Sequence, residues 1–246
     1  MRIHAATVGV GPPVVLVHGY GVSGAYMRPL ARALATSCSV LVPDLPGQGK
    51  SDVLRGRVNI AALADCLGDW IDANELGCPL VVANSMGCQI ATQLAVTRPC
   101  LVGPLVLVGP TIDPARRGGR RQLVATLRDA AREPLTLVAL AALDDASVGI
   151  RGLLATGRAA LADRIEERLP HITETVVVVF GEEDGFVSRE WAERVTALLP
   201  RGRLVVVPDE PHAVHYTRPD LVAGIVRELL VEECEHAVGE LFRRFE

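Results

Sequence analysis

Short apolar runs alternate with longer amphipathic stretches along most of the chain. The runs are rich in β-branched residues and apolar throughout, and a strand of that kind must be covered on both faces. Stretches with helical periodicity, such as 58–74 and 188–199, separate the runs and can supply this cover. The pattern predicts an α/β fold with a mostly parallel central sheet and helices on both faces. The expected strands lie at residues 3–8, 14–17, 39–42, 80–83, 105–108, 176–180 and 204–207.

The alternation breaks once, between residues 112 and 170. This segment has no strand-like run, and its leucines and valines indicate helices. We expect 112–170 to form a small helical cap inserted into a core made of residues 1–111 and 171–246. The last part of the chain, about 231–246, is expected to be a helical extension with one apolar stripe. That stripe fits either a docked terminal helix or one side of a homodimer contact.

Composition and charge exclude several classes of protein. With 246 residues, 49% of them hydrophobic and 22% charged, the chain is long enough for one large domain and is not a disordered protein. The net charge of −4 offers no electrostatic attraction to nucleic acid. No apolar run approaches the ~18–20 residues that cross a membrane, and the first residues do not resemble a secretory signal. We therefore expect a cytoplasmic protein with no nucleic-acid or membrane partner.

The six cysteines show no CxxC pair and no zinc-like spacing. Most of them have apolar neighbours in the sequence, so they are expected to be buried, reduced thiols. No metal site and no organic cofactor are predicted.

The candidate chemistry begins with a serine between a predicted strand and a predicted helix. In Ala83-Asn84-Ser85-Met86-Gly87, small residues stand two positions before and two positions after the serine, as a sharply turning backbone requires. Such a turn lifts the hydroxyl onto the C-terminal edge of the sheet, at a helix N-terminus that favours negative charge. On its own, an ordinary helix N-cap serine explains this motif equally well.

Two further polar residues follow other predicted strands. Asp184 comes just after the run at 176–180, and His212 comes just after the run at 204–207. The carboxyl ends of parallel strands open at one edge of a sheet, so Ser85, Asp184 and His212 are expected to meet there. A hydroxyl, an imidazole that activates it and a carboxylate that orients the imidazole are the components of nucleophilic acyl transfer. The sequence therefore predicts a catalytic triad.

The sequence offers a second candidate for the catalytic acid and a second candidate for the catalytic base. Asp113, just beyond the run at 105–108, is the reserve candidate for the acid, and Asp184 is preferred for its Gly-x-x-Asp setting. His215 lies three residues after His212 and is the main competitor for the base.

Further segments carry a resemblance to a known superfamily. Residues 17–21, VHGYG, are similar to the His-Gly oxyanion loop of the α/β-hydrolase superfamily, and residues 43–52, PDLPGQGKSD, are similar to its D-x-x-G-x-G-x-S turn. In 212–219 a proline follows the histidine by seven residues, as in the closing signature of that superfamily. The resemblance covers about residues 3–230 and departs from the usual pattern at Ala83, where a glycine is common. It implies the α/β-hydrolase fold with a helical cap.

The resemblance also implies a role for each candidate residue. Ser85 is the nucleophile, His212 is the base and later the acid, and Asp184 holds the imidazole in the right tautomer. The backbone N–H groups of Met86 and Tyr20 are the expected donors of an oxyanion hole. Three aromatic residues are expected, from their positions alone, to line the substrate pocket: Tyr26, Phe186 and Tyr216.

The function predicted from these residues is that of a serine hydrolase. It would cleave a small ester, thioester or lactone through an acyl-enzyme, with a small acyl substrate as its partner. One alternative is a C–C bond hydrolase of vinylogous diketones, because Asn84-Ser85-Met86-Gly87 resembles the nucleophile turn of that subfamily. Against it, Ala213 stands where that subfamily commonly has an aromatic residue. The other alternative is a non-catalytic small-molecule binder with the same fold, which would have no need of an intact triad.

Overall fold

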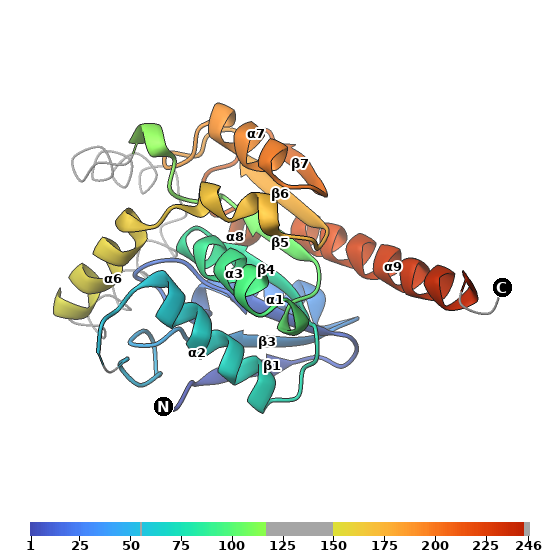
Figure 1. Cartoon of the computed structure of the whole chain (residues 1–246), viewed down its shortest axis with the longest axis horizontal. Coiled ribbons are helices and arrows are strands. Elements are labelled where there is room, and N and C mark those ends of the chain that lie inside the picture. Colours follow the sequence, from blue (N-terminus) through green and yellow to red (C-terminus); the bar gives the residue numbers. More distant parts are fainter. Residues whose placement is uncertain (55, 117–149, 244–246) are drawn as a thin grey trace.

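In the computed structural model, which describes residues 1–54, 56–116 and 150–243, the chain folds around one seven-stranded sheet (Figure 1). The strand order is β1-β3-β2-β4-β5-β6-β7, and every neighbouring pair is parallel except β1 with β3. This is the mostly parallel sheet that the apolar runs predict. The strands are β1 (Ala5–Val8), β2 (Pro13–Val17), β3 (Ser39–Pro43), β4 (Leu80–Asn84), β5 (Leu105–Val108), β6 (Val176–Gly181) and β7 (Gly202–Val207).

Helices connect the strands and cover both faces of the sheet. The helix predicted for 188–199 begins after Ser188, whose Oγ accepts a hydrogen bond from the N–H of Trp191 at 3.2 Å. In the described part of the chain, no helix is both long and apolar enough to span a membrane. The α-helices are α1 (Arg28–Leu34), α2 (Ile60–Ala73), α3 (Met86–Thr97), α6 (Ile150–Ala162), α7 (Arg189–Leu198), α8 (Val214–Thr217) and α9 (Pro219–Arg243). Short 3-10 helices are η1 (Gly24–Met27), η2 (Pro99–Leu101), η3 (Pro114–Arg116), η4 (Ile165–Glu167) and η5 (Leu169–His171).

Successive residues of each central strand belong to two buried clusters, one on each face of the sheet. On β4, Val81 and Ala83 pack in the cluster that contains residues of α2, α3 and α7. Leu80 and Val82 pack in the cluster that contains residues of α1, α8 and α9. All four side chains are at most 2% exposed. Burial on both faces explains why the strands are apolar throughout.

The segment predicted to form a cap is described only in part. It begins with η3, and after residues 117–149, which lie outside the described residues, it continues as α6, η4 and η5. The described part of the segment contains no strand. The division into a core and a cap at 112–170 stays a prediction.

The C-terminal helix α9 is one continuous element, and the extension predicted from residue 231 is its second half. Val222, Val226 and Leu229 are buried in the cluster that also contains α1, whereas Val231 is 57% exposed. Figure 1 shows this second half projecting away from the sheet. The side chains of 236–243 lie outside the described residues, and a docked helix or a homodimer contact stays a prediction.

The cysteines differ from the expectation that most of them are buried. All six are free thiols, but only Cys38 and Cys88 are fully buried. Apolar sequence neighbours do not reveal whether a loop or a helix surface packs inward, so this prediction is wrong for the remaining thiols. The partly or fully exposed cysteines are Cys66, Cys78, Cys100 and Cys234.

His215 in α8 is a fully buried histidine. Its ring lies edge-on to Tyr26, with ring centroids 4.6 Å apart, and Tyr26 also stacks on Tyr216 at 6.1 Å. Among the described residues, neither ring nitrogen of His215 has a hydrogen-bond partner. Burial, with a smaller contribution from the nearby imidazole of His212, lowers the pKa of His215 to about 3. The ring is therefore neutral in the folded protein at neutral pH.

This pKa predicts a loss of stability in acid. Below about pH 6.5 the unfolded chain binds a proton at His215 that the folded protein does not, so the free energy of unfolding falls by up to about 1.4 kcal/mol per pH unit towards pH 3. Urea unfolding at several pH values measures the slope. The variant His215→Leu is expected to show a flatter slope, whereas the same change at the exposed His171 should leave the slope unchanged. An unchanged slope in His215→Leu would contradict the prediction.

Candidate active site

Ser85 occupies the sharp turn between β4 and α3. Its backbone has φ 55° and ψ −121°, a strained conformation for a residue with a side chain. The N–H of Ser85 donates to the carbonyl of Val108 on the neighbouring strand β5 at 3.0 Å, which holds the turn against the sheet. A Cβ at Gly87 would lie 2.6 Å from the carbonyl oxygen of Val17, so this position needs glycine. Ala83 is fully buried in β4, so the fold accommodates the methyl group there.

The loop after β2 passes directly over the serine. A Cβ at Gly19 would lie 3.1 Å from the Cβ of Ser85. The ring of His18 holds this loop, because its Nε2 accepts from the N–H of Leu45 at 2.9 Å and its Nδ1 lies 2.9 Å from the carbonyl oxygen of Gly19. Since Nε2 accepts, Nδ1 carries the proton and donates. The backbone that leads into Tyr20 is therefore fixed beside Ser85.

Asp184 and His212 form a buried pair at the ends of β6 and β7. His212 Nδ1 and Asp184 Oδ2 are 2.7 Å apart, a short hydrogen bond. The other carboxylate oxygen, Oδ1, accepts from the N–H groups of Phe186 at 2.7 Å and Val187 at 2.9 Å. Asp184 is 8% exposed and His212 is 5% exposed. The backbone donors fix the carboxylate, and the carboxylate fixes the orientation of the imidazole.

Gly109 connects the serine to this pair. Its φ is 55°, and a Cβ there would lie 2.7 Å from both Cε1 and Nδ1 of His212. The preceding residue, Val108, accepts the hydrogen bond from the N–H of Ser85. Two consecutive residues at the end of β5 thus contact the serine and the histidine. Sequence reasoning missed Gly109, and the available signal was a glycine directly after a predicted strand.

The competing acid and base lie in other environments. Asp113 Oδ2 accepts from the hydroxyl of Ser188 at 2.8 Å, and its Oδ1 accepts from the N–H of Ala115 at 2.8 Å. The carboxylate that bonds to His212 is that of Asp184. His215 packs on Tyr26 in the core. The geometry therefore favours Asp184 and His212 over Asp113 and His215.

The three aromatic residues expected in the pocket make different ring contacts. The ring of Phe186 is 4.7 Å from the ring of His212, beside the candidate site. Tyr26 and Tyr216 stack on each other, and Tyr26 contacts His215. A role for all three in substrate binding stays a prediction.

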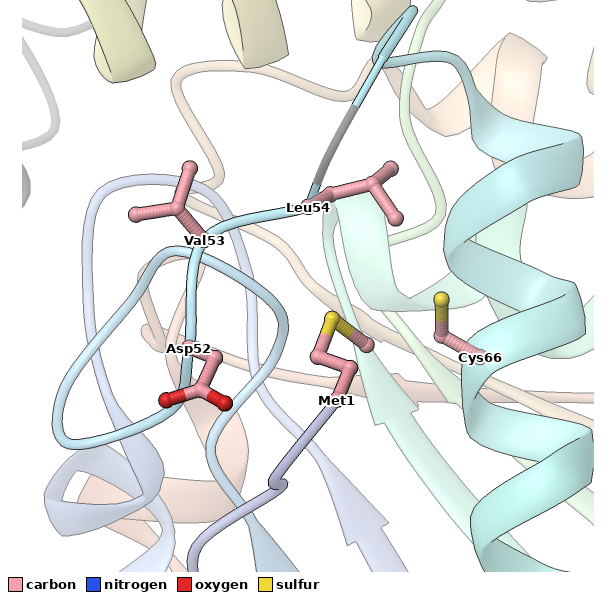
Figure 2. Close-up of a pocket in the computed structure, with 5 residues that line it drawn as sticks. All are labelled: Met1, Asp52, Val53, Leu54 and Cys66. Carbon is pink, nitrogen blue, oxygen red and sulfur yellow. The ribbon is translucent and has the colours of Figure 1, made fainter.

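A separate open cavity of about 700 Å³ lies between the N-terminus, the loop before α2 and α2 itself (Figure 2). The described residues of its wall are Met1, Asp52, Val53, Leu54 and Cys66, none of which belongs to the candidate triad. Burial, and then the nearby carboxylates of Asp69 and Asp65, raise the pKa of the Cys66 thiol. Within the described ranges, no group of three or more His, Cys, Asp or Glu side chains could hold a metal ion.

Known proteins resemble this chain over most of its length. The model of the Alpha/beta hydrolase family matches residues 14–225. The pimeloyl-[acyl-carrier protein] methyl ester esterase of Aliivibrio salmonicida is 28% identical over 94% of this chain and 97% of its own length. The 2-hydroxy-6-oxo-6-phenylhexa-2,4-dienoate hydrolase of Burkholderia cepacia is 28% identical over 93% of this chain and 91% of its own length.

Two further comparisons differ in how much of the related protein they cover. Polyketide synthase ThaQ of Burkholderia thailandensis is 30% identical over 93% of this chain, which spans only 12% of the length of that protein. The solved structure of a thermophilic esterase from Thermogutta terrifontis has a TM-score of 0.79 and 23% identity, covering 94% of this chain and 93% of that chain. At this identity the likeness shows a shared fold.

The packing of Gly109 on His212 predicts a difference between two glycine substitutions. Gly77 also has a positive φ, 66°, but a Cβ there would meet nothing within 4 Å. Gly77→Ala is expected to lower the free energy of unfolding by roughly 1–2 kcal/mol through backbone strain alone. Gly109→Ala should lose about 1–3 kcal/mol more, because its methyl group overlaps the imidazole. Urea unfolding of both variants measures the difference, and equal losses would contradict the close packing.

Proposed function

The chain belongs to the alpha/beta hydrolase family and is a hydrolase, and we propose that it cleaves a small ester, thioester or lactone through an acyl-enzyme on Ser85. The observation that carries the proposal is the 2.7 Å hydrogen bond between Asp184 and His212. This pair packs on Gly109, next to the residue whose carbonyl holds the Ser85 backbone. The backbone of Ser85 and the ring of His212 thus both contact the end of β5, which supports the assignment of a nucleophilic triad.

The reaction follows from the chemistry of these groups. With Nδ1 bonded to Asp184, Nε2 of His212 takes the proton from Ser85 Oγ as that oxygen attacks the substrate carbonyl carbon. The buried carboxylate stabilises the imidazolium that forms. The tetrahedral intermediate then collapses, and His212 returns the proton to the departing alcohol or thiol. A water molecule, activated by the same nitrogen, releases the acyl group from Ser85.

The negative charge of the tetrahedral intermediate needs donors that are already in place. The N–H of Met86 is at the first turn of α3, where the helix dipole favours an anion. The N–H of Tyr20 follows Gly19, where a Cβ would lie 3.1 Å from the Cβ of Ser85. Each such donor is typically worth about 2.7–4 kcal/mol of transition-state stabilisation.

A C–C bond hydrolase is the second candidate. The relative from Burkholderia cepacia is named for a dienoate substrate, and Asn84-Ser85-Met86-Gly87 resembles the nucleophile turn of such enzymes. Ala213, where an aromatic residue is common in that subfamily, is fully buried in the core cluster around α8. A panel of p-nitrophenyl esters, acyl thioesters, lactones and vinylogous diketones would separate the two candidates by their relative kcat/KM.

The variant Ser85→Ala tests the nucleophile. Hydrolysis of a p-nitrophenyl ester is expected to fall by at least about 10³-fold, because the variant lacks the hydroxyl that forms the acyl-enzyme. A fluorophosphonate probe should label the wild-type protein and not the variant. Ser37→Ala, a substitution at a hydroxyl that contacts Arg227, is the control and should retain the wild-type rate. Near-full activity in Ser85→Ala would overturn the assignment, and an unlabelled, inactive wild type would favour a non-catalytic binder.

A pair of conservative variants tests the acid. Asp184→Asn is expected to lower kcat by about 10³–10⁴-fold, because an amide at this position favours the wrong tautomer of His212. Asp113→Asn changes a carboxylate that accepts from Ser188 and should retain kcat within about tenfold of wild type. Steady-state kinetics, with circular dichroism to confirm folding, gives the comparison. The opposite ranking would assign the acid to Asp113.

A further inference from the structure

The side chain of Tyr20 reaches away from the candidate site to α6. Its hydroxyl donates to the carbonyl oxygen of Leu153 at 3.0 Å, although the residue as a whole is 44% exposed. Its ring also lies against Gly157, where a Cβ would be 3.3 Å from the hydroxyl oxygen and 3.4 Å from Cζ. Leu153 and Gly157 are four residues apart and share one face of α6. Tyr20 therefore contacts a continuous patch of this helix.

The backbone of Tyr20 is fixed on its other side by the core. The ring of His18 bonds to both the N–H of Leu45 and the carbonyl of Gly19. Gly19 in turn lies against the Cβ of Ser85. The peptide that carries the Tyr20 N–H thus lies between a rigid contact to the core and a side-chain contact to α6.

The far end of α6 is attached to the helix that begins at the nucleophile. Gln89 on α3 is fully buried, and its Nε2 donates to the carbonyl of Ala160 at 3.0 Å. Arg168 bonds to both carboxylate oxygens of Asp163, at 2.8 and 2.7 Å, and to the carbonyl of Gln89 at 3.2 Å. Helix α6, drawn in yellow in Figure 1, is therefore bonded to α3 at one end and to Tyr20 nearer the other.

We propose that Tyr20 is a positioning residue, a latch that joins α6 to the oxyanion loop and sets the direction of its own backbone N–H. The proposal rests on the proposed serine-hydrolase function. The two expected oxyanion donors lie on the two segments that α6 joins, since Met86 begins α3 and Tyr20 follows Gly19. The position of α6 then controls how well both donors face a developing oxyanion.

The first test removes only the hydroxyl. Tyr20→Phe keeps the ring on Gly157 and loses the bond to Leu153, so kcat for a p-nitrophenyl ester is expected to fall about 3–10-fold with KM within about twofold. Thr196→Val is the matched control, because it also removes a hydroxyl that donates to a helix carbonyl, that of Ala192, on α7. The control should retain the wild-type kcat. A Tyr20→Phe variant with wild-type kcat, or with a change in KM alone, would overturn the latch.

A second variant separates positioning from structural support. Gly157→Ala keeps the hydroxyl but requires the tyrosine ring to move by a few tenths of an ångström, and alanine favours the helix more than glycine does. The thermal midpoint is expected to stay unchanged or rise while kcat falls. A role in folding alone would instead make kcat follow stability. An unchanged kcat in this variant would contradict the proposal.

Hydrogen exchange tests the latch without relying on activity. In Tyr20→Phe, amide exchange is expected to be faster in peptides covering 150–162 and 18–22, and unchanged in peptides covering β5. Unchanged exchange in both segments would overturn the latch even in an active enzyme. Absence of fluorophosphonate labelling in the wild-type protein would instead refute the serine-hydrolase function, and exchange would still decide whether Tyr20 couples the loop to α6.

Discussion

The candidate site depends on one constraint, which is that the serine turn and the ring of His212 both pack against the backbone at the end of β5. The carbonyl of Val108 holds the serine turn, and Gly109 leaves room for the imidazole of His212 in the next position. This arrangement is available because β4, β5, β6 and β7 are parallel and end at the same edge of the sheet. A side chain at residue 109 would displace the histidine, and a slipped strand register would separate it from the serine.

The site combines several features that are unfavourable in isolation. Ser85 has a positive φ, and Asp184 and His212 are removed from solvent. The surrounding fold compensates for each of them. The carboxylate of Asp184 accepts two backbone hydrogen bonds besides that of His212, and the strained serine backbone is bonded to β5. The two buried clusters on the faces of the sheet supply the stability that keeps these groups in place before substrate arrives, which is the condition for electrostatic preorganisation.

The loop of His18, Gly19 and Tyr20 joins this rigid centre to α6. One end of the loop is fixed by the fully buried ring of His18, and the side chain of Tyr20 is bonded to a helix from another part of the chain. The relatives of this chain include one named as a methyl ester esterase and one named as a dienoate hydrolase. In our proposal the chemistry resides at the sheet edge, and contacts from outside the sheet, such as that of α6, are where related proteins can differ.

The local sequence pattern was sufficient to predict many features of this protein. Unbroken apolar runs predicted the parallel strands, the cap residue Ser188 predicted the start of α7, and the polar residues just after strands predicted the pairing of Asp184 with His212. Other features depended on contacts between segments distant in sequence. The need for glycine at residue 109, the burial of His215, the exposure of Cys78 and the bond from Tyr20 to Leu153 each depend on what another segment places beside the residue. Hydrophobic periodicity is a property of one segment and can be read from it, whereas steric exclusion and long-range hydrogen bonding exist only once two segments have met.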